Sequence, residues 1–284
     1  MISVRNLTFT YPKASSPAVQ DVSFYVEKGQ ILGFLGPSGA GKSTVQNLMI
    51  GLLPIQRGSV KYEGKSIKEM GKGFYNRIGV SFENPNLYEK LTGAENLRFY
   101  GGLFDRPVIP PEKLLDMVGL ADAAHKRASE YSKGMRQRLV FARSLMNRPD
   151  ILFLDEPLAS LDPGTAHKIK EVILEEKGRG ATIFLTTHNM FMADELCDIV
   201  AFINDGKLVA QDPPRALKLR YGQRAVKVEY RATVGLESET LFLQNEDDLK
   251  RLNGLVSSGN VETMHSQEAT LEQIFIKLTG RGLS

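Results

Sequence analysis

The order of apolar and polar residues divides this 284-residue chain into regions with different periods. Residues 2–11 and 19–26 alternate between apolar and polar side chains, a pattern typical of half-buried strands. Residues 30–35 are mostly apolar, as in a strand that is buried on both faces. The N-terminal region is therefore predicted to combine an antiparallel edge with a buried core strand.

A helix is predicted a few residues after this buried strand. Four apolar residues recur there at helical spacing and are expected to form its buried face: Val45, Leu48, Met49 and Leu52. Gly51 and Pro54 are residues of the kind that end helices. The chain therefore passes through a strand, a loop and a helix in direct succession.

The pattern becomes helical from about Tyr88 to Asn147. Thr92 and Glu95 have the spacing of a capping box at the start of one helix. Residues 111–118 predict a second helix. This stretch is therefore interpreted as a helical insertion.

Continuous apolar strands resume at residues 151–154 and 181–185, with a helix predicted between them. Strands of this kind are typical of parallel sheets that are covered on both faces. The fold class is therefore predicted to be α/β, with an antiparallel β subdomain and the helical insertion added to the core.

A smaller C-terminal domain is predicted after a helix that begins at Pro213-Pro214 and ends at Tyr221-Gly222. The later pattern indicates strands at residues 225–231, 240–243 and 261–265, and helices near residues 246–257 and 270–278. We therefore expect two domains, residues 1–222 and a small α+β domain at residues 223–284.

Composition excludes some classes of protein. The chain has 36 basic and 33 acidic residues, a net charge of +3, which does not predict nucleic acid as a partner. The single cysteine, Cys197, excludes a disulfide framework. No apolar run approaches the length of about 20 residues that crosses a bilayer. If the protein serves a membrane, another chain is expected to span it.

The loop between the buried strand and the first helix is a complete phosphate-binding loop. It has the pattern G-x-x-x-x-G-K-S and consists of Gly36, Pro37, Ser38, Gly39, Ala40, Gly41, Lys42, Ser43 and Thr44. Glycines let successive backbone N–H groups turn toward phosphate oxygens. Lys42 adds positive charge, and Ser43 offers a hydroxyl to Mg²⁺. The alternative is a glycine-rich turn that binds no nucleotide, but the strand-loop-helix context favours a P-loop NTPase core.

Two carboxylates follow the buried strand at residues 151–154. Asp155 is expected to reach Mg²⁺, and Glu156 to face the γ-phosphate and accept a proton from the attacking water. Because the carboxyl ends of parallel strands meet at one edge of a sheet, both should lie beside the phosphate loop. The alternative is that Asp-Glu-Pro only begins a helix.

In these motifs the chain resembles the nucleotide-binding subunit of an ATP-binding-cassette (ABC) transporter, over about residues 1–222. Residues 131–138, Tyr-Ser-Lys-Gly-Met-Arg-Gln-Arg, resemble the family signature, which implies that Ser132 and Gly134 contact ATP across a dimer interface. Residues 159–162 resemble the loop that reaches the partner's site through Asp162. His188 resembles the switch histidine at the γ-phosphate.

Three further positions bear on this resemblance. Tyr11 resembles the aromatic residue that stacks on adenine, although a core role is the alternative because Leu7 and Phe9 share its face. Glu83 stands where the family commonly has a glutamine, and a carboxylate there can still coordinate Mg²⁺. Lys133 replaces the commonest glycine of the signature, and either adds positive charge near the partner's nucleotide or points to solvent.

The resemblance implies a function. Two subunits, identical or different, would close head to tail around two Mg-ATP, with Lys42, Glu156 and His188 as catalytic residues. The dimer would drive a separate integral-membrane permease from the inner face of the cell membrane. Residues 270–280 are similar to the end of subunits from the ABC-2 exporter branch, although packing alone also explains this apolar helix.

Two alternatives come from other classes. Non-transport ATPase clamps of DNA repair or translation usually carry a coiled-coil insertion or two cassettes, whereas this chain has one cassette and no sustained heptads. A P-loop kinase for a small metabolite would give no reason for the motif around Ser132. The sequence therefore favours the transport ATPase, without naming its cargo.

Overall fold

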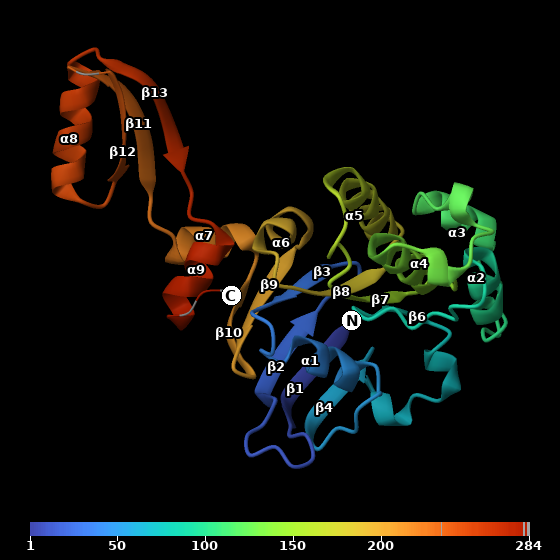
Figure 1. The fold of residues 1–284 in the computed structure, drawn as a ribbon. Coiled ribbons are helices and arrows are strands. Elements are labelled where there is room, and N and C mark those ends of the chain that lie inside the picture. The colour runs from blue at the N-terminus through green and yellow to red at the C-terminus, as the bar shows by residue number, and fades with distance from the viewer. Residues whose placement is uncertain (234, 281, 283–284) are drawn as a thin grey trace. The chain divides into compact units, whose positions relative to one another are not determined.

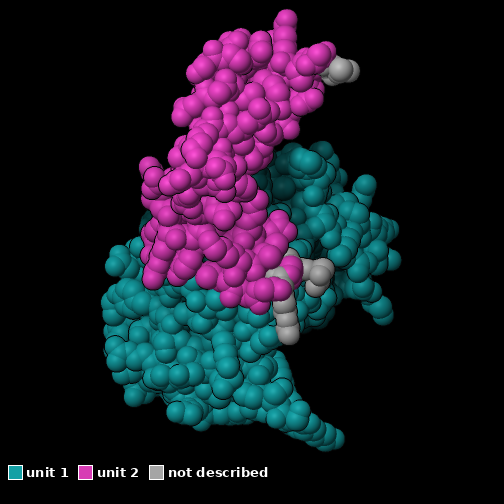
Figure 2. All heavy atoms as spheres, turned by 90° about the vertical axis from the view of Figure 1, so that its left-hand side faces the viewer, with its two compact units in different colours: residues 1–211, 283–284 teal, residues 212–282 magenta. Residues whose placement is uncertain are grey.

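The computed structural model describes residues 1–233, 235–280 and 282. These residues form two compact units, residues 1–211 and residues 212–282, which Figure 2 colours separately. Among the helices of the described residues, none is long and apolar enough to cross a membrane.

The larger unit is built around a six-stranded sheet with the order β10-β9-β3-β8-β7-β6 (Figure 1). The strands are β3 (Ile31–Leu35), β6 (Ile78–Ser81), β7 (Ile151–Asp155), β8 (Thr182–Thr187), β9 (Ile199–Asn204) and β10 (Lys207–Asp212). From β9 to β6, every neighbouring pair is parallel. Every residue of β3, β7 and β8 is buried, which confirms that their continuous apolar runs are core strands.

A second sheet, with the order β2-β1-β4-β5, is antiparallel and confirms the predicted antiparallel subdomain. Its strands are β1 (Ile2–Phe9), β2 (Val19–Val26), β4 (Arg57–Tyr62) and β5 (Lys65–Ser66). Aromatic rings join this sheet to the central one: the centroid of Phe34 lies 5.3 Å from that of Phe24 and 5.5 Å from that of Phe184. The two sheets therefore pack against each other in one shared hydrophobic core.

Six α-helices belong to the larger unit. They are α1 (Lys42–Met49), α2 (Gly93–Gly101), α3 (Pro111–Met117), α4 (Lys133–Leu145), α5 (Pro163–Gly178) and α6 (Met190–Leu196). Short 3₁₀ turns occupy Ile67–Glu69, Lys72–Phe74, Ala121–Ala123 and Ala128–Glu130. Helices α2, α3 and α4 pack together as the predicted insertion, and the capping box of Thr92 and Glu95 opens α2.

The predicted buried face of α1 is wrong at one position. The helix ends at Met49, and Leu52, which lies beyond it, is 62% exposed. Gly51, with a φ of +78°, ends the helical path before Leu52 can face the core.

The smaller unit is a three-stranded antiparallel sheet with three helices. The elements are α7 (Pro214–Tyr221), β11 (Ala225–Ala232), β12 (Gly235–Phe242), α8 (Glu246–Ser257), β13 (Val261–Gln267) and α9 (Leu271–Thr279), with the strand order β12-β11-β13. Helix α8 packs on the sheet over Val228 and Tyr230. Helix α7 packs against α9, which places α7 in this unit. The predicted division into a nucleotide-binding domain, residues 1–222, and an accessory domain, residues 223–284, stays a prediction.

Candidate nucleotide site

The phosphate loop connects β3 to α1 at the carboxyl edge of the central sheet, and two of its glycines have no room for a side chain. A Cβ on Gly36 would lie 2.2 Å from the carbonyl oxygen of Ile203 in β9. A Cβ on Gly41 would lie 2.6 Å from the carbonyl oxygen of Ala18, and the φ of Gly41 is +107°. Neighbouring backbone therefore determines the path of the loop on both sides.

Helix α1 begins at Lys42 with Gly41 as its N-cap, and among the described residues no side chain caps it. Its first N–H groups and its positive end therefore face the loop, an arrangement that binds anions. The Nζ atom of Lys42 donates hydrogen bonds to the carbonyl oxygens of Gly36 at 2.7 Å and Pro37 at 2.9 Å. Burial lowers the pKa of Lys42, and the nearby carboxylates of Glu156, Asp155 and Glu83 oppose that shift.

Asp155 is the last residue of β7 and is 5% exposed. Its carboxylate accepts hydrogen bonds from the hydroxyls of Thr186, on the neighbouring strand β8, and Ser43, in the phosphate loop. Burial raises the pKa of Asp155, whereas the two hydroxyls and Lys42 favour the ionised form. A buried carboxylate beside a serine hydroxyl is thus held at the base of the loop.

Glu156 follows β7 with a φ of +47°, an uncommon conformation for a residue with a side chain. Its Oε2 accepts a hydrogen bond from the hydroxyl of Thr187 at 2.8 Å. Its Oε1 accepts one from the backbone N–H of His188 at 2.9 Å and lies 2.6 Å from Nδ1 of the same residue. The strained backbone and these contacts fix one carboxylate oxygen against an imidazole that is 60% exposed.

Tyr11 lies at the open side of the loop. Its ring meets that of Phe9 edge to face with the centroids 4.9 Å apart, and its hydroxyl lies 3.1 Å from Oγ1 of Thr44. The residue is 41% exposed, so the alternative of a core role for Tyr11 is wrong. Glu83, two residues beyond the end of β6, is also exposed.

These side chains surround one cavity of about 530 Å³. Its lining consists of Tyr11, Ala18, Ser38, Gly39, Gly41, Lys42, Ser43, Thr44, Glu83, Asp155, Glu156 and His188. Apart from Ala18, each of these was a candidate from the sequence. Of the loop residues, Gly36, Pro37 and Ala40 shape the loop from outside the cavity.

Three candidates lie apart from this cavity, and they are grouped with one another. Ser132 caps α4 by accepting a hydrogen bond from the N–H of Met135 at 3.2 Å, and Asp162 caps α5 by accepting one from the N–H of Thr165 at 3.0 Å. Gly134 approaches the loop before α5 so closely that a Cβ would lie 3.2 Å from the carbonyl oxygen of Ser160. A single chain therefore keeps Ser132, Gly134 and Asp162 apart from its own phosphate loop.

The oxygen atoms at the base of the loop fit Mg²⁺. Asp155 and Ser43 already hydrogen-bond each other, and Glu83 lines the same cavity, so the donors are hard oxygens. The described residues contain no group of three acidic, histidine or cysteine side chains close enough to hold a metal alone. This suits an ion that takes one or two protein oxygens and completes its shell with water and substrate phosphates.

Three contacts of the candidate site were not predicted from the sequence. The hydroxyls of Thr186 and Thr187 orient Asp155 and Glu156, and the only sequence signal for them is a pair of threonines where apolar residues of a buried strand end. Ala18 contributes a backbone carbonyl beside Gly41, and nothing in its own residue type marks it.

Comparison of this chain with known proteins points to the same family in each case. The ABC transporter family matches residues 19–159. The chain is 52% identical to a "Fluoroquinolones export ATP-binding protein" of Mycobacterium tuberculosis, over all of this chain and 95% of that protein. It is 34% identical to "Nod factor export ATP-binding protein I" of Paraburkholderia xenovorans, over 93% of this chain and 92% of that one.

Solved structures agree with these relatives. An ATP-binding subunit of an ABC transporter matches 98% of this chain and 99% of its own, with 25% identity and a TM-score of 0.72. A dimeric ATP-binding cassette in a post-hydrolysis state, bound to ADP and phosphate, matches 75% of this chain and 98% of its own, with 25% identity and a TM-score of 0.68.

Proposed function

This chain belongs to the ABC transporter family, and we propose that its nucleotide site is completed by a second subunit and powers an export permease. It is an ATP-binding subunit with ATPase activity, on the α/β fold of that family. The observation that supports the proposed residues is the single cavity that joins the phosphate loop, Asp155, Glu156 and His188.

We propose that the phosphate loop binds the β- and γ-phosphates of ATP. Its N–H groups and the uncapped start of α1 supply partial positive charge, and Lys42 supplies a full one. In the structure the Nζ atom of Lys42 donates hydrogen bonds to two carbonyl oxygens of the loop at 2.7 and 2.9 Å, so its ammonium already points across the loop. Tyr11, exposed beside Thr44, would stack on the base.

We propose Glu156 as the general base. Its carboxylate is oriented by Thr187 and His188, and a positioned base of this kind contributes about 10²- to 10⁴-fold to a rate. The exposed imidazole of His188 is free to contact the γ-phosphate and the attacking water. Ser43, Asp155 and Glu83 would hold Mg²⁺, which neutralises charge developing on the phosphate oxygens when it is bound.

We propose that Ser132, Gly134 and Asp162 act on the ATP of the partner subunit. They lie together at the starts of α4 and α5, apart from the cavity of their own chain. The hydroxyl and N–H groups at the start of α4 form an anion-binding end like that of α1. A head-to-tail dimer, homo- or heteromeric, would bring this end against the γ-phosphate.

A permease is proposed to dock between β6 and the helical insertion. Rings of Tyr88 and Phe99 meet there with centroids 4.7 Å apart, although each residue is nearly half exposed. A cavity of about 580 Å³ opens beside them and is lined by residues that include Phe82, Tyr100 and Leu103. Exposed aromatic side chains around a hollow are typical of surfaces that bind another protein.

We propose export as the direction of transport and the inner face of the cell membrane as the site of action. Both named relatives are export proteins, and at 52% identity over the full chain the fluoroquinolone exporter is the better guide to cargo than the Nod factor exporter at 34%. The proposed cargo is therefore of drug type, recognised by the permease.

The dependence of activity on protein concentration tests the shared site. If two chains complete each site, the ATPase rate per chain should rise with chain concentration until dimerisation saturates. A rate per chain that is constant at every dilution would exclude a transient dimer.

Cells that express the chain with its permease should accumulate less of a fluorescent fluoroquinolone than cells with the Glu156→Gln variant, and equal accumulation would contradict the proposed cargo.

A further inference from the structure

The smaller unit has two cavities that share a wall. The residues that line both cavities lie where α7 passes into β11 and where β13 passes into α9, and they are Gly222, Gln223, Ala225, Gln267, Glu268 and Ala269. These segments are in close contact: a Cβ on Gly222 would lie 2.3 Å from the carbonyl oxygen of Lys218 and 2.8 Å from Cβ of Ala269. The two segments are therefore closely packed where Gly222 meets Ala269.

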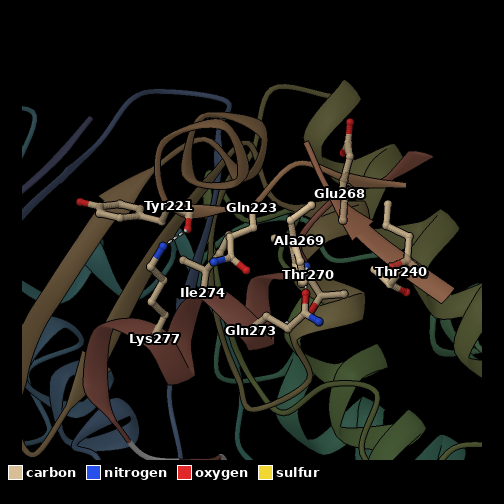
Figure 3. Close-up of a pocket in the computed structure, with 13 residues that line it drawn as sticks. Tyr221, Gln223, Thr240, Glu268, Ala269, Thr270, Gln273, Ile274 and Lys277 are labelled. Carbon is tan, nitrogen blue, oxygen red and sulfur yellow. Dashed lines mark hydrogen bonds between the residues drawn. The ribbon is translucent and has the colours of Figure 1, made fainter. Parts of the chain in front are cut away.

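The larger cavity, of about 750 Å³, has a structural explanation (Figure 3). The ammonium of Lys277 donates a hydrogen bond to the carbonyl oxygen of Tyr221 at 2.8 Å, which ties α9 to the end of α7. The Oε1 atom of Gln273 accepts one from the N–H of Thr270 at 2.9 Å, as the capping box of α9. Glu268 points away from both in Figure 3. The side chains of Lys277 and Gln273 are thus already held by contacts within the unit.

The smaller cavity, of about 260 Å³, is different, because two of the positive side chains that line it have no such explanation. Arg215, Lys218 and Arg224 line it, opposed by one carboxylate, Glu268. The side chains of Arg215 and Arg224 make no hydrogen bond or ion pair with any residue that the structure describes. Two arginines without a partner among the described residues therefore line one hollow.

The same cavity has an apolar component. Leu219 of α7 lines it and is 66% exposed, and Leu243, next to β12, is half-buried at its other side. A guanidinium presents a planar set of donors that matches a carboxylate or a phosphate with two parallel hydrogen bonds. An exposed leucine beside such groups gains stability when an apolar chain covers it.

We propose that this cavity is a binding site for an amphiphile whose anionic head is a carboxylate or phosphate. The head is held by Arg215 and Arg224, with Lys218 adding positive charge, and the apolar body covers Leu219. Every described residue that lines the cavity belongs to the smaller unit, so we expect binding without ATP. The source of the amphiphile is either a free molecule or a lipid headgroup at the membrane surface.

Calorimetry on the full chain, with dihexanoyl phosphatidic acid below its micelle concentration, tests the site. One molecule should bind per chain, and Arg215→Gln or Arg224→Gln should each weaken binding by about tenfold, the usual effect of losing a charge-assisted hydrogen bond. Glu268→Gln should strengthen binding because a repelling carboxylate is removed. Arg57→Gln, an exposed arginine on β4 in the other unit, is the matched control and should have no effect.

Two further experiments define the ligand class and its source. Leu219→Ser should weaken binding of the amphiphile but leave binding of inorganic phosphate unchanged. Flotation with phosphatidylcholine vesicles that contain phosphatidylglycerol should retain the wild type and lose Arg215→Gln if the source is a membrane, and should retain neither if it is a free amphiphile. Absence of binding to the soluble probe, equal affinity for inorganic phosphate, or equal effects of Arg57→Gln and Arg215→Gln would each overturn the proposal.

Discussion

The carboxylate of Glu156 and the imidazole of His188 lie in contact, with 2.6 Å between Oε1 and Nδ1, although 32 residues of chain separate them. Glu156 directly follows β7 and His188 directly follows its parallel neighbour β8, so the pairing of these strands brings the two residues together. The same carboxylate accepts a hydrogen bond from the hydroxyl of Thr187. The group proposed to activate water is therefore already oriented by the sheet.

Replacing Glu156 with glutamine should separate binding from hydrolysis. Glutamine retains an oxygen that can accept from Thr187 but cannot take a proton from water, so hydrolysis should slow by about 10²- to 10⁴-fold. ATP affinity should stay close to wild type, and ATP-bound dimer should accumulate, which light scattering measures. Glu175→Gln, on the exposed side of α5, is the control. Wild-type hydrolysis by Glu156→Gln would make Glu156 structural.

Mixing two inactive variants should restore activity if the site is shared. Lys42→Ala should lose ATP binding because the phosphate charge is no longer offset, and Ser132→Arg should block closure over the partner's γ-phosphate. In a mixed dimer one site has both defects and the other has neither. ATPase activity should therefore reappear on mixing. No recovery, in a mixture shown by pull-down to contain the heteromer, would place Ser132 and Lys42 in unrelated sites.

Glu83→Gln should have opposite effects on ATP and on Mg²⁺. Removing the carboxylate removes its repulsion of the γ-phosphate, so metal-free ATP should bind more tightly. Half-saturation of hydrolysis by Mg²⁺ should need a higher concentration because an anionic oxygen ligand is lost. The affinity for metal-free ATP is measured by titrating ATP in the presence of a chelator. The requirement for Mg²⁺ is measured by titrating Mg²⁺ at saturating ATP. Unchanged values in both titrations would falsify the assignment of Glu83 to the metal.

Gly36→Ala should destabilise the protein and remove ATP binding. The added methyl would meet the carbonyl oxygen of Ile203 at 2.2 Å, so β9 or the loop must shift, at a cost of at least about 1–3 kcal/mol. Gly178→Ala is the matched control, because beyond its chain neighbours and the backbone of its own helix no described atom lies within 4 Å of its Cβ position. Thermal unfolding with and without ATP measures both effects. Equal melting temperatures for the two variants would contradict the close contact.

Residues 1–211 should bind ATP without the rest of the chain. Every residue that lines the nucleotide cavity lies in that unit, and we propose that the smaller unit is accessory to it. A second truncation after residue 222 keeps α7 without its packing partner α9 and should bind ATP equally, though with lower solubility. Calorimetry with Mg-ATP makes the comparison. Loss of binding by a truncated chain that still unfolds cooperatively would contradict this division.

Local features of the site could be predicted from the sequence because they depend on neighbours along the chain. The glycines of residues 36–41, the capping box of Thr92 and Glu95, and the continuous apolar strands β3, β7 and β8 all depend on residues close in sequence. These features determined the order of the elements and the class of substrate. The weakly apolar strands β4 and β5 carried no comparable signal.

Only the tertiary structure decided which distant residues meet. Gly36 must be glycine because Ile203 comes within reach of it, and the carboxylates of Asp155 and Glu156 are oriented because β8 places two threonine hydroxyls beside them. These contacts depend on the strand order of the sheet, which brings together residues far apart along the chain. A sequence pattern shows which residues suit a strand or a loop, whereas the register between strands sets which atoms come within hydrogen-bonding distance.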